Sequence, residues 1–157
     1  MNPNYVYAVA IGIGVVAGLR SLLAPAAVAW AVCLGWLHLQ GTSLGFVESK
    51  VALIIFSLLA IGELGADLLP QTPKRTDLVP LLVRMVTGGF CGACLCASAN
   101  RSLAIGTMLG AAGGLIGAFA GYEVRRRLVS KLNIRDYFVA LSEDLVAVGL
   151  AWFFLSR

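Results

Sequence analysis

Long apolar stretches separated by short polar segments dominate the pattern of this chain. Five such stretches can be read: residues 5–39, 51–69, 78–97, 102–129 and 137–155. A straight transmembrane helix needs about 20 predominantly apolar residues. The pattern therefore predicts an all-α fold, a polytopic transmembrane helical bundle of about five segments, in one integral membrane domain over residues 1–157.

The first stretch is too long for one straight span and carries polar chemistry in its middle. Arg20 and Pro25 both lie there, and Pro25 has no N–H to donate to the carbonyl of Ser21. We therefore expect the first segment to be kinked, broken or re-entrant near Arg20–Pro25. Non-helical backbone at membrane depth is tolerated only inside protein or beside water. The pattern leaves open whether this stretch crosses the membrane once or twice.

Composition supports a membrane protein. Hydrophobic residues make up 59% of the chain, whereas a soluble domain has about 45–50%. The net charge is +4, but the basic residues cluster beside the apolar stretches, where they commonly set orientation. We therefore expect a multi-pass membrane protein and no nucleic-acid partner.

Basic residues gather in two connecting segments. One segment carries Lys74 and Arg75, and the other, at and after the end of the fourth stretch, carries Arg125, Arg126, Arg127, Lys131 and Arg135. The positive-inside rule places both segments in the cytoplasm. The C-terminus is then outside. The N-terminus is inside if the first stretch crosses once and outside if it crosses twice.

Ionisable residues inside the apolar stretches are the main indication of function. Glu63 and Asp67 are four residues apart and share one helix face. A second acidic pair, Glu143 and Asp144, interrupts the last stretch. A charge at the centre of a bilayer costs about 2.5–3.5 kcal/mol on insertion scales, so such residues usually line a polar site.

Positions along the helices place several charges at one depth. Glu63, Arg84 and Glu143 each lie about six residues from the expected cytoplasmic end of their stretch, or roughly 9 Å. Glu123 is slightly shallower and Arg20 is deeper. We expect a polar pocket open to the cytoplasm, in which Arg84 compensates carboxylates and Arg20 pairs with Glu63 or Glu143. The candidate solute- or ion-binding residues are Arg20, Glu63, Asp67, Arg84, Glu123, Glu143 and Asp144.

Glycines recur at four-residue spacing in the fourth stretch. Two offset series are present: Gly106, Gly110 and Gly114, and Gly113, Gly117 and Gly121. Small residues at this spacing let helices approach closely in lipid. We expect a central helix packed against two neighbours, and the same pattern also suits a dimer interface. Residues 14–20 and 117–123 resemble each other as a weak internal repeat, of a kind that occurs in transporters.

Cysteines offer a second candidate chemistry. Cys91, Cys94 and Cys96 lie together in an apolar stretch, Cys33 is far from them in sequence, and His38 is the only histidine. A single CxxC with no nearby histidine is a weak metal or redox signal. We interpret the cysteines as free thiols that pack as small apolar residues, and we expect no metal site and no cofactor.

Three motifs carry a family resemblance. Residues 17–25 (AGLRSLLAP), 62–73 (GELGADLLPQTP) and 141–147 (LSEDLVA) resemble, in the same order, a prokaryotic membrane family catalogued as domain of unknown function 4126. The resemblance covers most of the chain. It implies a small multi-spanning protein of a prokaryotic inner (plasma) membrane and no particular activity. The positions that match its motifs are Gly18, Leu19, Arg20, Glu63, Asp67, Pro70, Glu143 and Asp144.

Three functions remain open at this point. We favour a proton-linked transporter or channel-like protein for a small polar solute or ion, acting through the acidic and arginine cluster. The second is a non-catalytic assembly or lipid-binding protein, in which the charges form a structural network. The third is an enzyme that holds Mg²⁺ and acts on a lipid or isoprenoid phosphate, against which stands the lack of a recognisable nucleophile and base. The expected partners are the bilayer, the solute and a second copy of the chain.

Overall fold

Helices account for nearly all of the chain that the computed structural model describes, residues 3–66, 77–132 and 136–156. These residues form six α-helices and one short 3-10 helix, with no strand among them, and the all-α prediction is confirmed. The elements are α1 (Pro3–Leu19), α2 (Leu23–Cys33), η1 (Gly45–Glu48), α3 (Lys50–Ala66), α4 (Leu78–Ser98), α5 (Leu103–Leu132) and α6 (Asp136–Leu155).

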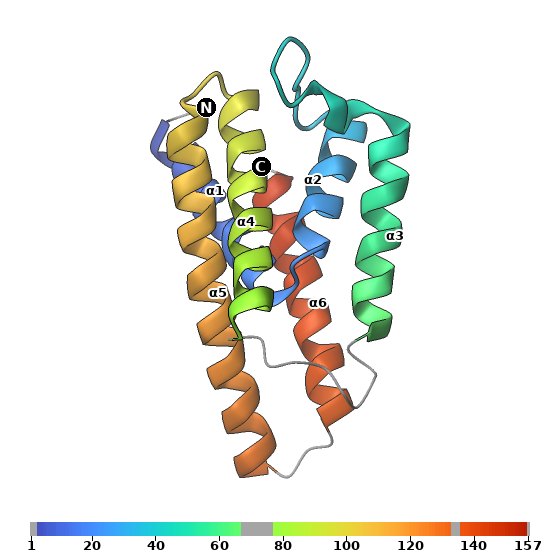
Figure 1. The fold of residues 1–157 in the computed structure, drawn as a ribbon, viewed down its shortest axis with the longest axis vertical. Coiled ribbons are helices and arrows are strands. Elements are labelled where there is room, and N and C mark those ends of the chain that lie inside the picture. The colour runs from blue at the N-terminus through green and yellow to red at the C-terminus, as the bar shows by residue number, and fades with distance from the viewer. Residues whose placement is uncertain (1–2, 67–76, 133–135, 157) are drawn as a thin grey trace.

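The first apolar stretch is a helical hairpin. α1 ends at Leu19 and α2 begins at Leu23, so the break falls within the range predicted from the sequence. Pro25 is the third residue of α2, where a backbone N–H has no partner inside its own helix. In Figure 1, α1 descends from the N-terminus into the molecule and α2 returns toward the end from which α1 started.

The two ends of the molecule differ in what they carry. Figure 1 shows the end of α3, the start of α4, the end of α5 and the start of α6 together at one end, which we call the lower end. Both termini lie toward the opposite, upper end. The two basic segments connect helices at the lower end, although Lys74, Arg75 and Arg135 lie outside the described residues.

Glycines bring α4 and α5 into close contact. A Cβ atom on Gly106 would stand 2.5 Å from the carbonyl oxygen of Gly92, and one on Gly88 would stand 2.6 Å from that of Gly110. A Cβ on Gly114 would stand 2.7 Å from the carbonyl oxygen of Arg84. Real Cβ atoms essentially never come this close, so these positions accept only glycine without a shift of backbone.

The second glycine series of α5 faces α1. A Cβ on Gly113 would overlap the carbonyl of Ile11, and one on Gly117 would overlap that of Val15. Gly18 of α1 lies opposite this series: a Cβ atom on Gly18 would stand 2.6 Å from the Cα of Gly117. Gly121, the last glycine of the series, is buried. Helix α5 therefore packs against α4 with one glycine series and against α1 with the other.

Asn100 closes the turn between α4 and α5. It adopts the left-handed conformation, with φ of 53°. The N–H of Arg101 donates to the carbonyl of Cys96, and the N–H of Asn100 donates to that of Ala97. This is the Schellman arrangement that ends a helix, and it lets α5 return alongside α4.

Two helices of the described chain are long and apolar enough to cross a membrane. They are α4 and the part of α5 from Leu103 to Leu128. Helices α1 and α2 are apolar but shorter. Large apolar side chains are exposed on the outer helices, for example Leu58 of α3 and Leu145 of α6. The described helices thus include two candidate membrane helices, and the count of five crossings stays a prediction.

Candidate functional site

The candidate site is built around the break between α1 and α2, residues 20–22, which we call the helix break. Helix ends leave carbonyl groups at the C-terminus of α1 and N–H groups at the N-terminus of α2 without partners inside their helices. Arg20 and Ser21 are buried, with 2% and 8% of their surface exposed. Buried backbone groups need partners from elsewhere in the protein. Helices α3 and α4 supply them, and α6 supplies a partner for the side chain of Arg20.

Glu63 of α3 caps the N-terminus of α2. Its Oε1 accepts hydrogen bonds from the backbone N–H of Ser21 at 2.8 Å and from the Ser21 hydroxyl at 2.5 Å. Its Oε2 accepts a hydrogen bond from the N–H of Leu22 at 2.7 Å. A negative charge is stabilised at a helix N-terminus by the helix dipole. One carboxylate therefore accepts hydrogen bonds from two consecutive backbone N–H groups of the helix break, those of Ser21 and Leu22.

Arg84 of α4 caps the C-terminus of α1. Its Nη1 donates to the carbonyl oxygen of Gly18 and, at 3.0 Å, to that of Leu19. Arg84 is buried, with 8% of its surface exposed. A cation at a helix C-terminus complements the negative end of the dipole. From the sequence we expected Arg84 to compensate carboxylates. The structure shows that Arg84 also donates hydrogen bonds to these two carbonyl oxygens.

Arg20 connects the helix break to α6. Its Nε and Nη2 each lie 2.5 Å from Oδ1 of Asp144. The Arg20 side chain is 2% exposed and the Asp144 side chain 21%. The sequence analysis expected Glu63 or Glu143 as the partner of Arg20. Glu63 is engaged by Ser21 and Leu22, and Asp144, the residue after Glu143, forms the ion pair.

These contacts bring most of the predicted site residues together. We call the set Arg20, Ser21, Glu63, Arg84 and Asp144 the break cluster. Glu143 is half-buried on α6, beside Asp144. Ser21 was missed from the sequence, because a single serine in an apolar stretch gives no sign that its N–H and hydroxyl both face a carboxylate.

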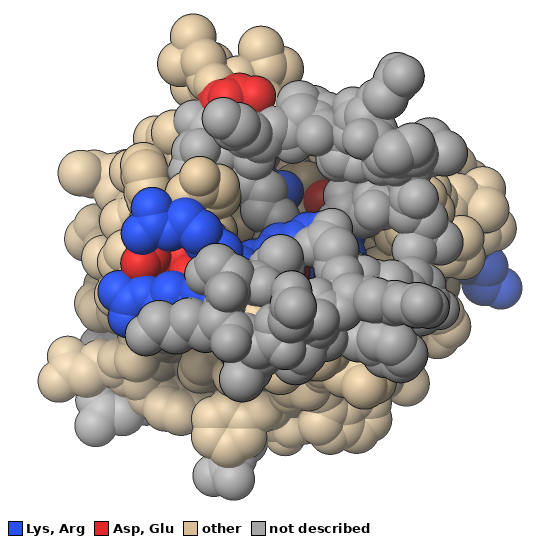
Figure 2. Space-filling view, turned by 90° about the horizontal axis from the view of Figure 1, so that it is seen from below, with Lys and Arg blue, Asp and Glu red and all other residues tan. Residues whose placement is uncertain are grey.

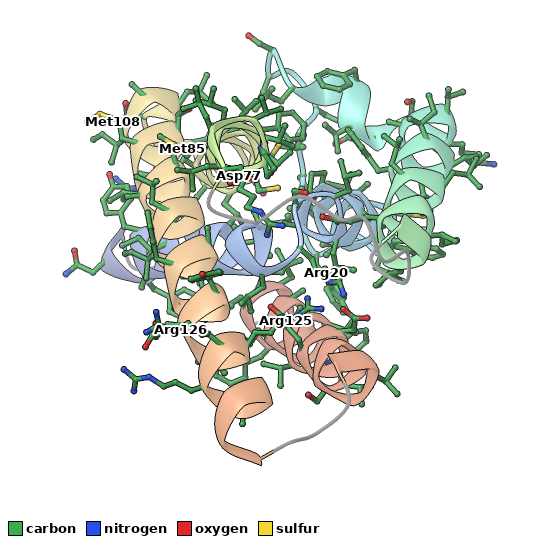
Figure 3. The ribbon with its side chains drawn as sticks, turned by 60° about the horizontal axis from the view of Figure 1, so that its bottom comes forward. Arg20, Asp77, Met85, Met108, Arg125 and Arg126 are labelled. Atoms are coloured by element: carbon green, nitrogen blue, oxygen red, sulfur yellow. The ribbon has the colours of Figure 1, made fainter. Side chains whose placement is uncertain are left out.

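Arg125 is a further residue that the sequence analysis did not place in the site. Figure 3 shows Arg125 between α5 and α6, on the side of α5 that faces Arg20, while Arg126 points away on the other side. From the sequence, Arg125, Arg126 and Arg127 were interpreted together as part of one basic cytoplasmic segment. Consecutive helical residues are about 100° apart around the axis, and this rotation separates the two arginines.

Glu123 lies apart from the break cluster. Its carboxylate accepts hydrogen bonds from Arg126 at 3.0 Å and from Arg127 at 2.7 Å, all on α5. Figure 2 shows acidic and basic atoms together at one edge of the lower face, and more of them between grey residues nearer its centre. Within the described residues, Glu123 is thus paired with arginines of its own helix. Asp67 lies outside the described residues.

Cysteines and acidic residues form no metal-ligand group in the described part of the chain. No cluster of three or more His, Cys, Asp or Glu residues that could hold a metal ion occurs there. Cys91, Cys94 and Cys96 are buried in α4, Cys33 is exposed, and all four are free thiols. The buried thiols contribute to packing, as in the contact of Cys96 with Gly106.

The fold and the break cluster define a class: a helical protein with candidate membrane helices, in which a helix breaks inside the bundle and other helices supply charges to its ends. The family model described as "Domain of unknown function (DUF4126)" matches residues 7–156, and the chain belongs to this family. The resemblance of the three sequence motifs is thereby confirmed. No curated protein and no solved structure matches the chain.

Proposed function

We propose that this protein is a multi-pass integral membrane protein that moves a small polar solute or ion, linked to protons, through the break cluster. The observation that carries the proposal is that Glu63 accepts hydrogen bonds from the backbone N–H groups of Ser21 and Leu22 in the helix break. Secondary transporters commonly bind their substrates where a membrane helix is discontinuous. The predicted setting is a prokaryotic inner membrane, with the lower end in the cytoplasm.

Protonation of Glu63 gives a physical link between protons and conformation. An ionised carboxylate only accepts hydrogen bonds, whereas a protonated one turns one oxygen into a donor. One of the three donors on Glu63 then loses its acceptor, and a buried donor without a partner is costly. Because Arg20 precedes Ser21 directly, a rearrangement of the break also moves the ion pair of Arg20 with Asp144.

Accessibility within the cluster differs between its carboxylates and Arg20. Glu63 and Asp144 are half-buried, whereas Arg20 is 2% exposed. A proton or a cation can reach the two carboxylates more easily than an anion can reach Arg20. The site is therefore suited to protons and to small solutes with hydrogen-bond donors or positive charge.

Proton flux into liposomes tests this function. Purified protein is reconstituted in vesicles that contain the pH-sensitive dye pyranine, and a pH gradient is imposed with Na⁺ or K⁺ present. We expect the wild type to dissipate the gradient and Glu63→Gln to do so at least about tenfold more slowly, because glutamine fills the same space and takes up no proton.

Glu48→Gln is the matched control for this experiment. Glu48 accepts a hydrogen bond from the backbone N–H of Leu39 at 2.7 Å, away from the break cluster. Its replacement changes the same kind of contact and should leave the flux unchanged. Equal flux in wild type and Glu63→Gln, at equal protein content, would contradict the transport proposal.

A non-catalytic structural or lipid-binding role is the second candidate. The observation that favours it is that Glu63 and Arg84 both bond to backbone atoms of the helix break. In that case Glu63→Gln would lower the unfolding temperature, and neither variant nor wild type would conduct protons.

A further inference from the structure

An apolar groove runs along α2 between α3 and α6. Both α3 and α6 pack against α2, and within the described residues they make no contact with each other. The groove has a volume of about 400 Å³. Small side chains open it: Ala27 and Ala31 on the floor, Ala60 on the α3 side and Ala151 on the α6 side.

The side chains that line the groove are almost all apolar, so the groove is suited to a hydrocarbon chain and not to a polar solute. None of the residues that line it carries a charge. The hydroxyl of Ser57 accepts a hydrogen bond from Trp30 Nε1 at 3.2 Å, so this polar contact is made within the groove wall. At the end of the groove that follows α2, Trp36 and Trp152 pack edge to face with ring centroids 4.9 Å apart.

The length of the groove fits a single alkyl chain. The groove follows α2, whose 11 residues span about 16 Å. This length is close to half of the roughly 30 Å hydrocarbon core, which is the depth of one leaflet.

In a membrane, an apolar groove that the protein's own helices leave open is filled by the hydrocarbon chains around it. A helix of a second copy is the alternative occupant, and the tests below distinguish it from a lipid.

We propose that this groove binds one acyl chain of a bilayer phospholipid from the leaflet at the upper end. The inference rests on the membrane location given under the proposed function. Trp36 and Trp152 lie at the head-group end, since tryptophan gathers at membrane interfaces. The methyl end of the chain packs against Leu23 and Leu64. Leu23 directly follows Leu22, whose N–H binds Glu63, so the bound chain supports α2 beside the break cluster.

Native mass spectrometry of the gently solubilised protein, loaded with one phosphatidylcholine species, tests the proposal. We expect one lipid per wild-type chain. Ala60→Phe places a ring in the groove and should lower the lipid affinity at least about tenfold. Leu58→Phe is the control: it lies on the same helix, is exposed and is not part of the groove lining, and it should keep the lipid.

Intrinsic fluorescence gives a test that needs no variant. The chain has three tryptophans, and all of them, Trp30, Trp36 and Trp152, line the groove. Phosphatidylcholine with brominated chains, titrated into the detergent-solubilised wild type, should quench this fluorescence and saturate at one lipid per chain. Quenching that rises without saturation would overturn the proposal.

Two mass-spectrometric results would also overturn it. One is a lipid kept equally by Ala60→Phe and Leu58→Phe, and the other is a wild-type dimer without lipid. The flux experiment is independent of both. Lost lipid with intact flux refutes the groove alone, and bound lipid with no flux refutes the transport function alone.

Discussion

At the scale of single residues, the charges around the helix break are held by two kinds of contact. Glu63 and Arg84 bond to backbone atoms, whose positions are set by the helices. Arg20 instead pairs with a side chain, Asp144, that is partly open to solvent. The Arg20–Asp144 pair is therefore the contact in the break cluster that can open with the least change in backbone.

The two partners of this pair should not be equivalent in their effect on stability. Asp144→Asn removes a negative charge beside a guanidinium that is 2% exposed, and the loss of a carboxylate beside a buried cation costs up to about 3–5 kcal/mol. Arg20→Met leaves a carboxylate that is 21% exposed and can be hydrated. We expect a clearly larger loss in the free energy of unfolding for Asp144→Asn, measured by denaturant titration in mixed micelles.

Glu123→Gln is the control for this comparison. It changes an exposed ion pair with Arg126 and Arg127 on one helix, and exposed pairs contribute little to stability. A larger loss for Arg20→Met than for Asp144→Asn would show that the buried cation is not the dominant charge in this cluster.

The sequence identified most of these residues but not their pairing. Arg20, Glu63 and Asp144 stand out because each is ionisable in an apolar stretch. Neighbours such as Glu143 and Asp144 face directions about 100° apart on a helix. The rotation of α6 about its axis decides which way each of them faces, and this rotation is set by packing against α1 and α2.

At the scale of elements, the glycines of α5 decide which helices lie in the centre. The two glycine series set the distance between α5 and its neighbours, because backbone carbonyls of α1 and α4 lie where a Cβ atom on these glycines would be. Both series were visible in the sequence. The sequence did not show which series faces α1 and which faces α4, because the two faces of α5 are chemically alike.

Substitution of a contact glycine should therefore weaken the bundle. A Cβ on Gly88 would stand 2.6 Å from the carbonyl oxygen of Gly110. The helices must separate to admit it, and overpacking of this kind costs about 1–3 kcal/mol. We expect Gly88→Ala to lower the unfolding temperature in detergent, measured by circular dichroism.

Gly62→Ala provides the comparison on α3. A Cβ at Gly62 meets nothing within 4 Å, and alanine favours helix over glycine. Gly62→Ala should therefore leave the unfolding temperature unchanged or raise it. An equal loss in both variants would mean that the glycines act through helix flexibility and not through close packing.

At the scale of the whole molecule, the hairpin of α1 and α2 sets the orientation of the chain. Proline chemistry at Pro25 predicted a break, and the break at residues 20–22 lies where the carbonyl of Ser21 would need the missing N–H. Whether the chain continued or turned back could not be predicted, because both courses begin with the same break. Because α2 turns back, the N-terminus and the C-terminus lie toward the same end of the molecule.

Orientation in the membrane can be tested with two engineered cysteines in a variant that lacks the exposed Cys33. Gln40 is exposed in the connection between α2 and α3, and Arg126 is exposed at the far end of α5. The positive-inside rule places the basic lower end in the cytoplasm. We therefore expect a membrane-impermeant maleimide to label Gln40→Cys on intact cells or spheroplasts and to label Arg126→Cys only after the membrane is opened.

The outcome of this labelling also bears on the proposed function. Because the carboxylates of the break cluster are half-buried and Arg126 lies toward the lower end, labelling of Arg126→Cys from outside would place proton entry on the outer side of the membrane. It would also move the lipid groove to the inner leaflet, since the groove lies along α2, which runs toward the upper end. The Cys33→Ser parent is the control, because Cys91, Cys94 and Cys96 are buried and it should stay unlabelled in intact cells.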